Sequence, residues 1–444
     1  MRRSAWRFLF LSADIRNRLI ITLVLLVIYR FAAHVPVPGV DRQAIAEIFN
    51  QAGGGSTIFG LLDLLSGGTV SNFSVLAMGV YPYITAQIIL QLLTPIIPAL
   101  QRRMEEDPRE ARKWQEKWTY YLAVPMAALN AFGQIRLFQQ FVTSGDILRE
   151  PLGFNLPSIT MIVTMTAGTM FAIWLGELIS EYGIRNQGLS LIIFAGIVSR
   201  IPISLSRLMA DETTRVPLMI FMVILMVSTI FVIIYVQEGR RNVPVMYPGR
   251  RVGNRMSMPV KGTLPLMVNM AGMIPIIFAQ SLLTFPAVLA QFFVGSSNET
   301  IRNIATWLQT NFGGVNSTYW ILYFFFVVGF TFFYTDVIFS QQNYGENLKR
   351  SGAQIPGVTK GAPTQRYLTR VLRRITLPGA IFLGLVAVMP FLVGIIYPVG
   401  GSQSGLLLVS SAGLLIVVGV IRDTYRSIEA ELKLRGYDQA VLVR

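Results

Sequence analysis

The sequence contains no cysteine and only one histidine, His34. The lack of cysteine excludes disulfide bonds and thiolate metal sites, and a single histidine beside Pro36 is a poor metal ligand. Charged residues are also scarce: they make up 14% of the chain, against about 25% in a typical soluble domain. Because 53% of the residues are hydrophobic and the mean hydropathy is +0.54, the composition indicates a helical protein that crosses a membrane several times.

Apolar runs that approach the length needed to cross a bilayer, about 20 residues, recur along the whole chain. We count ten of them, which predicts an all-α polytopic fold. The seventh contains Pro265, Pro275 and Pro286, so we expect it to be kinked or tilted. The predicted spans are Arg18–Ala33, Asn72–Pro98, Trp118–Gln134, Leu156–Leu175, Gly188–Arg200, Val216–Val236, Thr263–Phe293, Tyr319–Thr335, Ile375–Ile396 and Leu406–Ile421.

Lysine and arginine are distributed unevenly among the segments between these spans. If the N-terminus lies in the cytoplasm, thirty of the 38 Lys and Arg residues fall in cytoplasmic segments, as the positive-inside rule requires. This predicts that both termini are cytoplasmic and that the number of spans is even. Arg200, Arg207 and Arg215 are the exception, because they fall in a segment that should face outside.

The N-terminus allows two interpretations. Three arginines precede an apolar run that ends at Ala32-Ala33, which is compatible with a cleavable signal peptide. The first span, however, lies behind a second basic flank at Arg16–Arg18. Residues 1–17 are therefore better explained as a basic cytoplasmic segment at the membrane surface.

Catalytic motifs are missing from the chain, and ionisable residues are almost absent from the predicted spans. Ion-coupled transporters keep charged residues at mid-membrane depth to bind substrate or relay protons, so a transporter of a small solute is an alternative that these spans do not favour. An intramembrane enzyme is the other alternative. Asp336, at the end of the eighth span, is its candidate acid, but no second acid lies at the same depth.

The stretch from Ile58 to Leu100 combines two hydrophobic segments of different length. The first, Ile58–Leu65, is too short to cross a bilayer and ends at a flexible Ser-Gly-Gly break. A full-length apolar run then begins at Asn72. We therefore expect a half-helix that enters the membrane and turns back, followed by a complete helix. Because unpaired backbone at membrane depth must be buried in protein or line a water-filled cavity, this pattern predicts a cavity within the membrane.

Several motifs along the chain occur in the order found in a known family. The run SVLAMGVYPYITAQIILQLLT (Ser74–Thr94) follows an LSGG segment, and LIIFAGIV lies in the fifth span. One basic loop ends in LPLMVNMAG (Val236–Gly272), and the next contains KRSGAQIPG (Asn347–Ala380). The C-terminal segment RSIEAELKLRGYDQ (Arg426–Gln439) is similar to the short cytoplasmic tail of the same family. Together these segments resemble the SecY family, the central subunits of Sec protein-conducting channels.

The resemblance implies a fold and a function. The implied fold is an all-α polytopic membrane protein, with ten transmembrane helices in two pseudo-symmetric halves of five around a central hourglass pore, and a short re-entrant plug helix. The implied function is translocation of unfolded preproteins across the plasma (inner) membrane and lateral release of transmembrane segments into the bilayer. The family performs no catalysis and uses no cofactor. Its partners are the SecE and SecG subunits, the SecA motor ATPase and the ribosome.

The same resemblance divides the chain into four parts. We expect a basic cytoplasmic segment at 1–17, an N-terminal half at 18–206, a C-terminal half at 207–421 and a cytoplasmic tail at 422–444. The N-terminal half would include the plug at 58–70. The C-terminal half would carry two cytoplasmic loops, at 237–262 and 340–374.

β-Branched residues recur at helical spacing in several predicted spans. Val80, Ile84 and Ile88 share one helix face because they are four residues apart. Such residues commonly face lipid or the bundle core; alternatively, they form an aliphatic ring that closes the narrowest point of a pore by dewetting. The family resemblance favours the ring. The seventh and tenth spans offer Ile274, Ile277, Ile416 and Ile421, and the predicted ring is Val80, Ile84, Ile193, Ile197, Ile277 and Ile421.

Two further sets of residues follow from the resemblance. Polar residues in spans two and seven are explained either by ordinary hydrogen bonds between helices or by a lateral gate, whose two helices part to release an apolar segment. The plug is either a mobile seal or an ordinary interfacial loop helix. The predicted gate is Thr85, Gln87, Gln91, Asn269 and Gln280, and the predicted plug is Gly60, Leu61, Leu62, Asp63, Leu64, Leu65, Ser66, Gly67, Gly68 and Thr69.

The two longest cytoplasmic loops are also the most basic. Positive-inside charge or lipid headgroup binding explains such loops in general, whereas the family resemblance implies contact with ribosomal RNA phosphates or with SecA. Binding to RNA phosphates would weaken strongly with salt. Thr359 departs from the family, which usually has arginine there, although Lys360 follows it. The candidate contact residues are Arg240, Arg241, Arg250, Arg251, Arg255, Lys349, Arg350 and Lys360.

The plug hypothesis predicts the effect of a deletion. Removing Gly60–Thr69 should raise the ion permeability of the resting protein, because the half-helix would no longer block the cavity. The measurement is the conductance of the purified protein in a planar bilayer without substrate. A channel that stays closed after the deletion would show that these residues are not the plug.

Overall fold

The computed structural model is largely helical, with two short β-hairpins among the described residues. It describes residues 13–40, 69, 73–141, 155–209, 215–248, 251–252, 255–256, 258, 260–291, 293, 298–312, 316–396 and 411–434. The helices are α2 (Ala13–Ala32), α5 (Tyr81–Ile96), α6 (Pro98–Glu106), α7 (Pro108–Phe141), α8 (Leu156–Tyr182), α9 (Gly188–Met209), α10 (Arg215–Glu238), α11 (Ile274–Gln291), α12 (Glu299–Phe312), α13 (Ser317–Gln341), α14 (Tyr344–Arg350), α15 (Ala362–Ile396) and α17 (Ser411–Leu434). The strands are β1 (Arg240–Tyr247), β2 (Arg251–Val252), β3 (Arg255–Met256) and β4 (Val260–Met267).

Each predicted span overlaps at least one helix of the structure. Helical stretches with both the length and the hydropathy to cross a bilayer are Leu156–Tyr182, Ser317–Arg350 and Ala362–Met389. Shorter apolar helical stretches are Gly188–Ser199, Val223–Glu238 and Ile274–Ala287. The structure therefore agrees with an all-helical membrane protein, while several helices run beyond the apolar segments that predicted them.

The seventh predicted span is wrong in its first third. Thr263–Met267 are not helical but belong to β4, which pairs antiparallel with β1 from Arg240↔Met267 to Tyr247↔Val260. The hairpin forms because the first strand alternates: Val243 and Val245 are buried, whereas Asn242 and Pro244 are exposed. The helix α11 begins only at Ile274, after a turn in which Gly272 adopts a left-handed φ of 65°.

The helix in the second predicted span is also shorter than the span itself. Residues 73–80 form consecutive turns, and α5 starts at Tyr81. Phe73 and Gly79 have φ of 41° and 51°, a conformation that a helix does not contain. Backbone hydrogen bonds from Val37 N to Phe73 O (3.1 Å) and from Val75 N to Val35 O (2.9 Å) hold these turns against the chain that follows α2.

Other helices continue past the predicted boundaries. The helix α9 runs to Met209 instead of Arg200, so Arg200 and Arg207 are helical, and Arg215 is the first residue of α10. The helix α17 runs to Leu434, well into the predicted tail. Apolar runs mark where a helix crosses lipid, but a helix ends where its backbone hydrogen bonds end, so the two boundaries differ.

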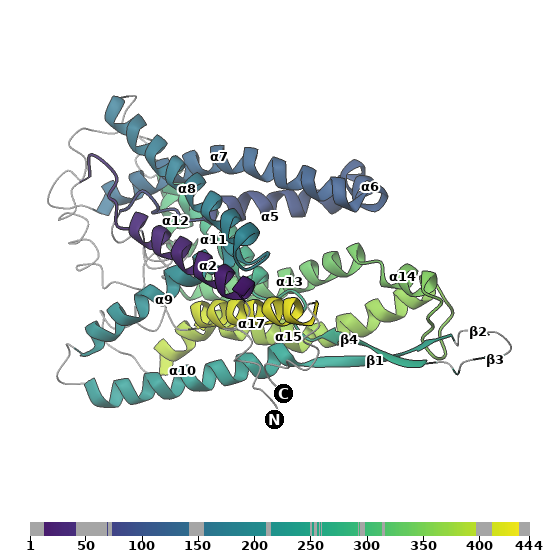
Figure 1. Ribbon diagram of the computed structural model, residues 1–444. Helices are drawn as coiled ribbons and strands as arrows, with labels where there is room; N and C mark the ends of the chain where they lie inside the picture. The colour runs from purple at the N-terminus through teal and green to yellow at the C-terminus, as the bar shows by residue number, and fades with distance from the viewer. Residues whose placement is uncertain are drawn as a thin grey trace.

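Buried apolar residues form two large clusters. The first is built from α2, α5, α7, α8 and α9. The second is built mainly from α10, α11, α13 and α15. The helix α17 contributes to both, with Ile416 and Val420 in the first and Leu414, Leu415 and Val418 in the second. In Figure 1, α17 accordingly lies between the flank formed by α5 and α7 and the flank formed by α10.

A glycine permits the close contact between the turns before α5 and the helix α8. A Cβ atom built on Gly168 would overlap the carbonyl oxygen of Val75. The contact therefore depends on the missing side chain, and it fixes the start of α5 against α8.

We predict that Gly168→Ala lowers the free energy of unfolding by about 1–3 kcal/mol, the usual cost of forcing extra atoms into a packed site. Gly329→Ala in α13 is the matched control, because a Cβ there meets no atom within 4 Å. It should leave stability unchanged or raise it by up to about 1 kcal/mol, since alanine favours helix. Unfolding midpoints in detergent give both values. Equal midpoints for the two variants would contradict the predicted clash.

Candidate functional site: an apolar junction of α5, α9 and α17

Three helices from distant parts of the sequence meet in the first apolar cluster. Val80, which caps the N-terminus of α5, is 1% exposed, and Ile197 of α9 is 3% exposed. Ile84 and Ile193 are partly buried and pack against the same cluster. The structure therefore places four of the six predicted ring residues in or against one apolar cluster.

The tenth predicted span enters this junction at a different residue from the predicted one. Ile416 of α17 is 5% exposed and belongs to the cluster, as does Val420. Ile421 has a side chain that is 51% exposed. The two candidates are equivalent in the sequence, because both are isoleucines in one apolar run, and only the rotation of α17 distinguishes them.

The seventh span contributes residues near the start of α11. Ile277 is buried and Ile274 is partly buried. Met273, which precedes the helix, packs against both apolar clusters. It is not among the predicted residues, because a single methionine before an apolar run gives no periodic signal in the sequence.

The predicted gate residues of α5 make few polar contacts with α11. Thr85 donates a hydrogen bond to the Tyr81 carbonyl within its own helix, at 3.0 Å. Gln87 is partly buried. In the part of the chain that the structure describes, the buried Oε1 of Gln91 has no hydrogen-bond partner. The side chain of Tyr81, which the sequence pattern did not identify, lies near Ser281 of α11. The Ser281 hydroxyl donates to the Ile277 carbonyl within its own helix at 2.8 Å.

On the α11 side, the two predicted gate residues lie in different settings. The side chain of Gln280, which lies in α11, is buried. Asn269 lies in the turn before the helix, where its Nδ2 donates to Gly272 O (3.1 Å) and its Oδ1 accepts from Gly272 N (2.9 Å). Asn269 therefore closes a turn at the end of the seam between α5 and α11, and its described bonds do not cross that seam.

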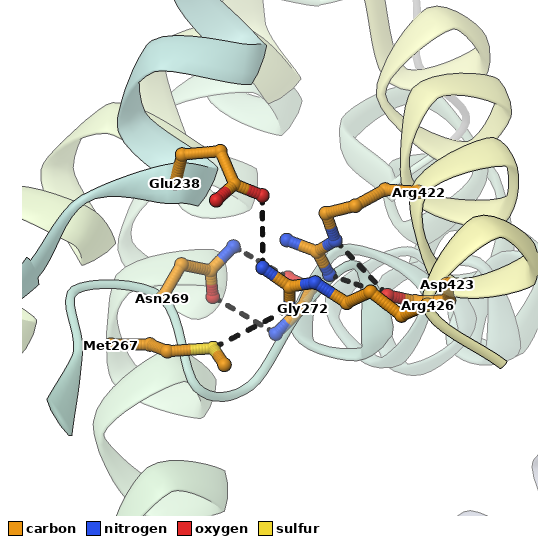
Figure 2. A network of polar contacts seen from close by, with 7 residues as sticks. All are labelled: Glu238, Met267, Asn269, Gly272, Arg422, Asp423 and Arg426. Carbon is orange, nitrogen blue, oxygen red and sulfur yellow. Dashed lines mark hydrogen bonds and ion pairs between the residues drawn. The ribbon is translucent and has the colours of Figure 1, made fainter. Parts of the chain in front are cut away.

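A polar network lies beside this turn (Figure 2). Arg426 of α17 donates to Glu238 at the end of α10 (2.8 Å) and contacts the Met267 sulfur (3.7 Å). Arg422 pairs with its neighbour Asp423 at 2.9 Å. A second ion pair joins α17 to α2, between Glu431 and Arg18 at 3.1 Å. These pairs tie one end of α17 to both flanks of the molecule.

The two basic loops pack into one unit. The hairpin of β1 and β4 is bonded to the segment after α14 through Met246 N to Gln354 O (2.8 Å) and Gln354 N to Met246 O (2.9 Å). A separate apolar cluster, which includes Val243, Leu348 and Leu368, lies beneath them. In Figure 1 the hairpin and α14 accordingly project from the same end of the molecule.

The predicted contact residues are distributed over this unit. Arg240, Arg241, Lys349, Arg350 and Lys360 have exposed side chains. Arg350 pairs with Glu346 one turn earlier at 3.1 Å, on the surface. Among the remaining candidates, Arg251 and Arg255 lie on β2 and β3, and Arg250 lies outside the described residues.

Most of the predicted plug, Gly60–Gly68, lies outside the described residues. Thr69 is described and is fully buried. Its hydroxyl donates to the Leu76 carbonyl at 2.7 Å, and its own carbonyl accepts from Ser74 N at 3.2 Å. Thr69 is therefore fixed to the turns that lead into α5.

The described residues also bear on the two alternative functions. Asp336, the candidate acid of an intramembrane enzyme, forms an ion pair with Arg373 at 2.9 Å, with both groups partly exposed. No group of three or more His, Cys, Asp or Glu residues that could hold a metal occurs within the described ranges. The carboxylate of Asp336 is thus paired with an arginine on the neighbouring helix α15.

Comparison with known proteins agrees with the sequence motifs. The SecY family model matches residues 74–425. The protein translocase subunit SecY of Streptomyces coelicolor is 37% identical over 97% of this chain and 97% of its own length. The SecY subunit of Aquifex aeolicus is 39% identical over 98% of both chains.

Solved structures share the fold at lower identity. A protein-conducting channel covers 95% of this chain and 93% of its own, with a TM-score of 0.65 and 19% identity. Sec61 in a canine ribosome–channel complex from the endoplasmic reticulum gives the same coverage, with a TM-score of 0.62 and 18% identity. With the family model matching most of the sequence and full-length relatives at 37–39% identity, this chain belongs to the SecY family.

Proposed function

We propose that this chain is the channel subunit of a bacterial protein translocase, which moves unfolded preproteins across the plasma membrane and releases transmembrane segments into the bilayer. The observation that carries the proposal is the apolar junction of α5, α9 and α17, in a chain whose full-length relatives are translocase subunits. A lining without charge binds no solute tightly, so it suits a path for varied polypeptides. The transporter alternative finds no support among the relatives.

The proposed architecture has ten membrane crossings in two halves of five, with both termini in the cytoplasm. The two apolar clusters support this division, because one belongs mainly to helices before α10 and the other to helices from α10 onward. The distribution of lysine and arginine supports the orientation. The helix α17 closes the second half and packs against the first.

We assign the seal to Val80, Ile84, Ile193, Ile197 and Ile277, together with Ile416 of α17. The first four and Ile416 pack in or against one cluster. Such a ring closes by excluding water, and it can reclose around a passing chain because it makes no directional bonds with it. Gly60–Thr69 would support the seal as the plug.

The lateral gate in this proposal is the seam between α5 and α11. The side chains of Tyr81 and Ser281 approach each other across it. A hydrogen bond between membrane helices is worth on the order of 1 kcal/mol. A seam held by so few polar contacts can open for an apolar segment at little cost.

The proposed docking surface for SecA and the ribosome is the unit of the two basic loops. Its exposed Arg240, Arg241, Lys349, Arg350 and Lys360 suit an RNA phosphate backbone. Thr359 stands where the family usually has arginine, and Lys360 supplies an ammonium instead of a planar guanidinium. SecE and SecG would complete the complex as family subunits.

The test of function is reconstitution. The purified chain is placed in proteoliposomes with SecE, SecG, the motor ATPase and a signal-bearing preprotein. We expect preprotein to become protected from external protease only when the chain and ATP are both present. Protection without the chain, or uptake of a small solute in the absence of partners, would contradict the proposal.

The proposed seal predicts different effects for substitutions at Ile416 and at Ile421. Ile416→Ser should raise the resting ion conductance in a planar bilayer, because a hydroxyl allows water into the apolar junction. Ile421→Ser is the matched control on the same helix, and it should leave the conductance at the level of the unmodified chain, since that side chain is exposed. Leakage through the Ile421 variant alone would show that α17 contributes Ile421 to the seal, as the sequence predicts.

A further inference from the structure

The N-terminal part of α15 carries a basic pocket that the proposed function leaves unexplained. The pocket is open, has a volume of about 610 Å³ and is lined by one helix. Four of its residues are arginines with exposed side chains. The lining residues are Gln365, Arg366, Thr369, Arg370, Arg373, Arg374 and Leu377.

The four arginines share a helix face with an exposed apolar stripe. The stripe consists of Leu377, Ile381 and Leu385, which follow one another at intervals of four residues and are all exposed. At 3.6 residues per turn, the four arginines and the stripe fall together within a sector of about 120°. One continuous surface of α15 is therefore cationic at its beginning and aliphatic further along.

The charge of the pocket is not balanced by nearby carboxylates. Arg373 pairs with Asp336 of α13 at 2.9 Å. In the described part of the chain, Arg366, Arg370 and Arg374 have no ion pair with a carboxylate. Guanidinium groups bind phosphate oxygens in a bidentate manner, so a phosphate group is the ligand that this excess charge suits.

The apolar stripe indicates that the ligand has an apolar part in addition to its phosphate. The stretch Ala362–Met389 is long and apolar enough to cross a bilayer, so the stripe passes from headgroup depth into the hydrocarbon. An RNA backbone or a free phosphate would satisfy the arginines but would leave Leu377, Ile381 and Leu385 without a counterpart. A phospholipid satisfies both, with its phosphate on the arginines and an acyl chain along the stripe.

We propose that this face of α15 is a binding site for an anionic phospholipid of the cytoplasmic leaflet. The site holds the headgroup phosphate with Arg366, Arg370 and Arg374, while Arg373 remains anchored to Asp336. It lies on the lipid-facing surface and is separate from the apolar junction. The proposal rests on the membrane placement of α15 but not on channel activity, so lipid binding and translocation test different claims.

The experiment measures lipid binding to the full-length chain, purified in detergent, by native mass spectrometry with phosphatidylglycerol as the probe. A cation at a membrane surface contributes about 1 kcal/mol, or about fivefold in affinity. Arg370→Gln/Arg374→Gln should therefore weaken phosphatidylglycerol binding by roughly 25-fold. Arg240→Gln/Arg241→Gln removes the same charge from the exposed hairpin and should leave this binding unchanged. Arg370→Lys/Arg374→Lys should keep most of it.

Further arms of the experiment distinguish the sources of phosphate. Phosphatidylcholine should bind the unmodified chain and the Gln variant equally, and inorganic phosphate should not displace phosphatidylglycerol. Leu377→Ser/Ile381→Ser should weaken phosphatidylglycerol binding while the arginines remain. Equal loss in the Gln variant and the hairpin control would overturn the site. Displacement of the lipid by inorganic phosphate, or by an RNA oligonucleotide, would assign the pocket to phosphate or RNA instead.

Discussion

Close packing of apolar side chains where α5, α9 and α17 meet is the interaction on which the rest of the structure depends. Such packing is non-directional, so it cannot fix the rotation of a helix by itself. The position of α17 is set at its far end by two ion pairs, Arg426 with Glu238 and Glu431 with Arg18. Directional contacts outside the apolar junction therefore help to determine which residues of α17 enter it.

The two helices at the seam, α5 and α11, are likewise positioned by contacts that lie outside the seam. The start of α5 is fixed by the turns of residues 73–80, which are hydrogen-bonded to the chain after α2 and pressed against Gly168 of α8. The start of α11 is fixed by the Asn269 turn. Between these fixed ends the two helices share few described polar contacts. The start of each helix is thus held by contacts other than those between α5 and α11.

Elements that depend on composition and hydrophobic period are predictable from the sequence, whereas features that depend on helix rotation or strand pairing are not. Each of the ten apolar runs overlaps at least one helix of the structure. Val80 and Ile84, which are four residues apart in the sequence, both lie in or against the first apolar cluster. That Ile416 is buried while Ile421 is exposed depends on how α17 is turned. Thr263–Met267 form a strand because their partner is β1, a pairing that the apolar pattern does not encode. The approach of Tyr81 to Ser281 likewise brings together residues two hundred positions apart.

Arginines occur on two chemically different surfaces, the β1–β4 hairpin and the start of α15. Arg240 and Arg241 on the β1–β4 hairpin are exposed, and they belong to a unit that has its own apolar cluster. Arginines at the start of α15 stand instead at the head of an exposed aliphatic stripe. The positive-inside rule does not distinguish these two sets of arginines, because it considers only the side of the membrane on which a charge lies. The two proposals therefore differ because the neighbours of the arginines differ: the proposed ligand is an RNA phosphate at the hairpin and a phosphate attached to an acyl chain at α15.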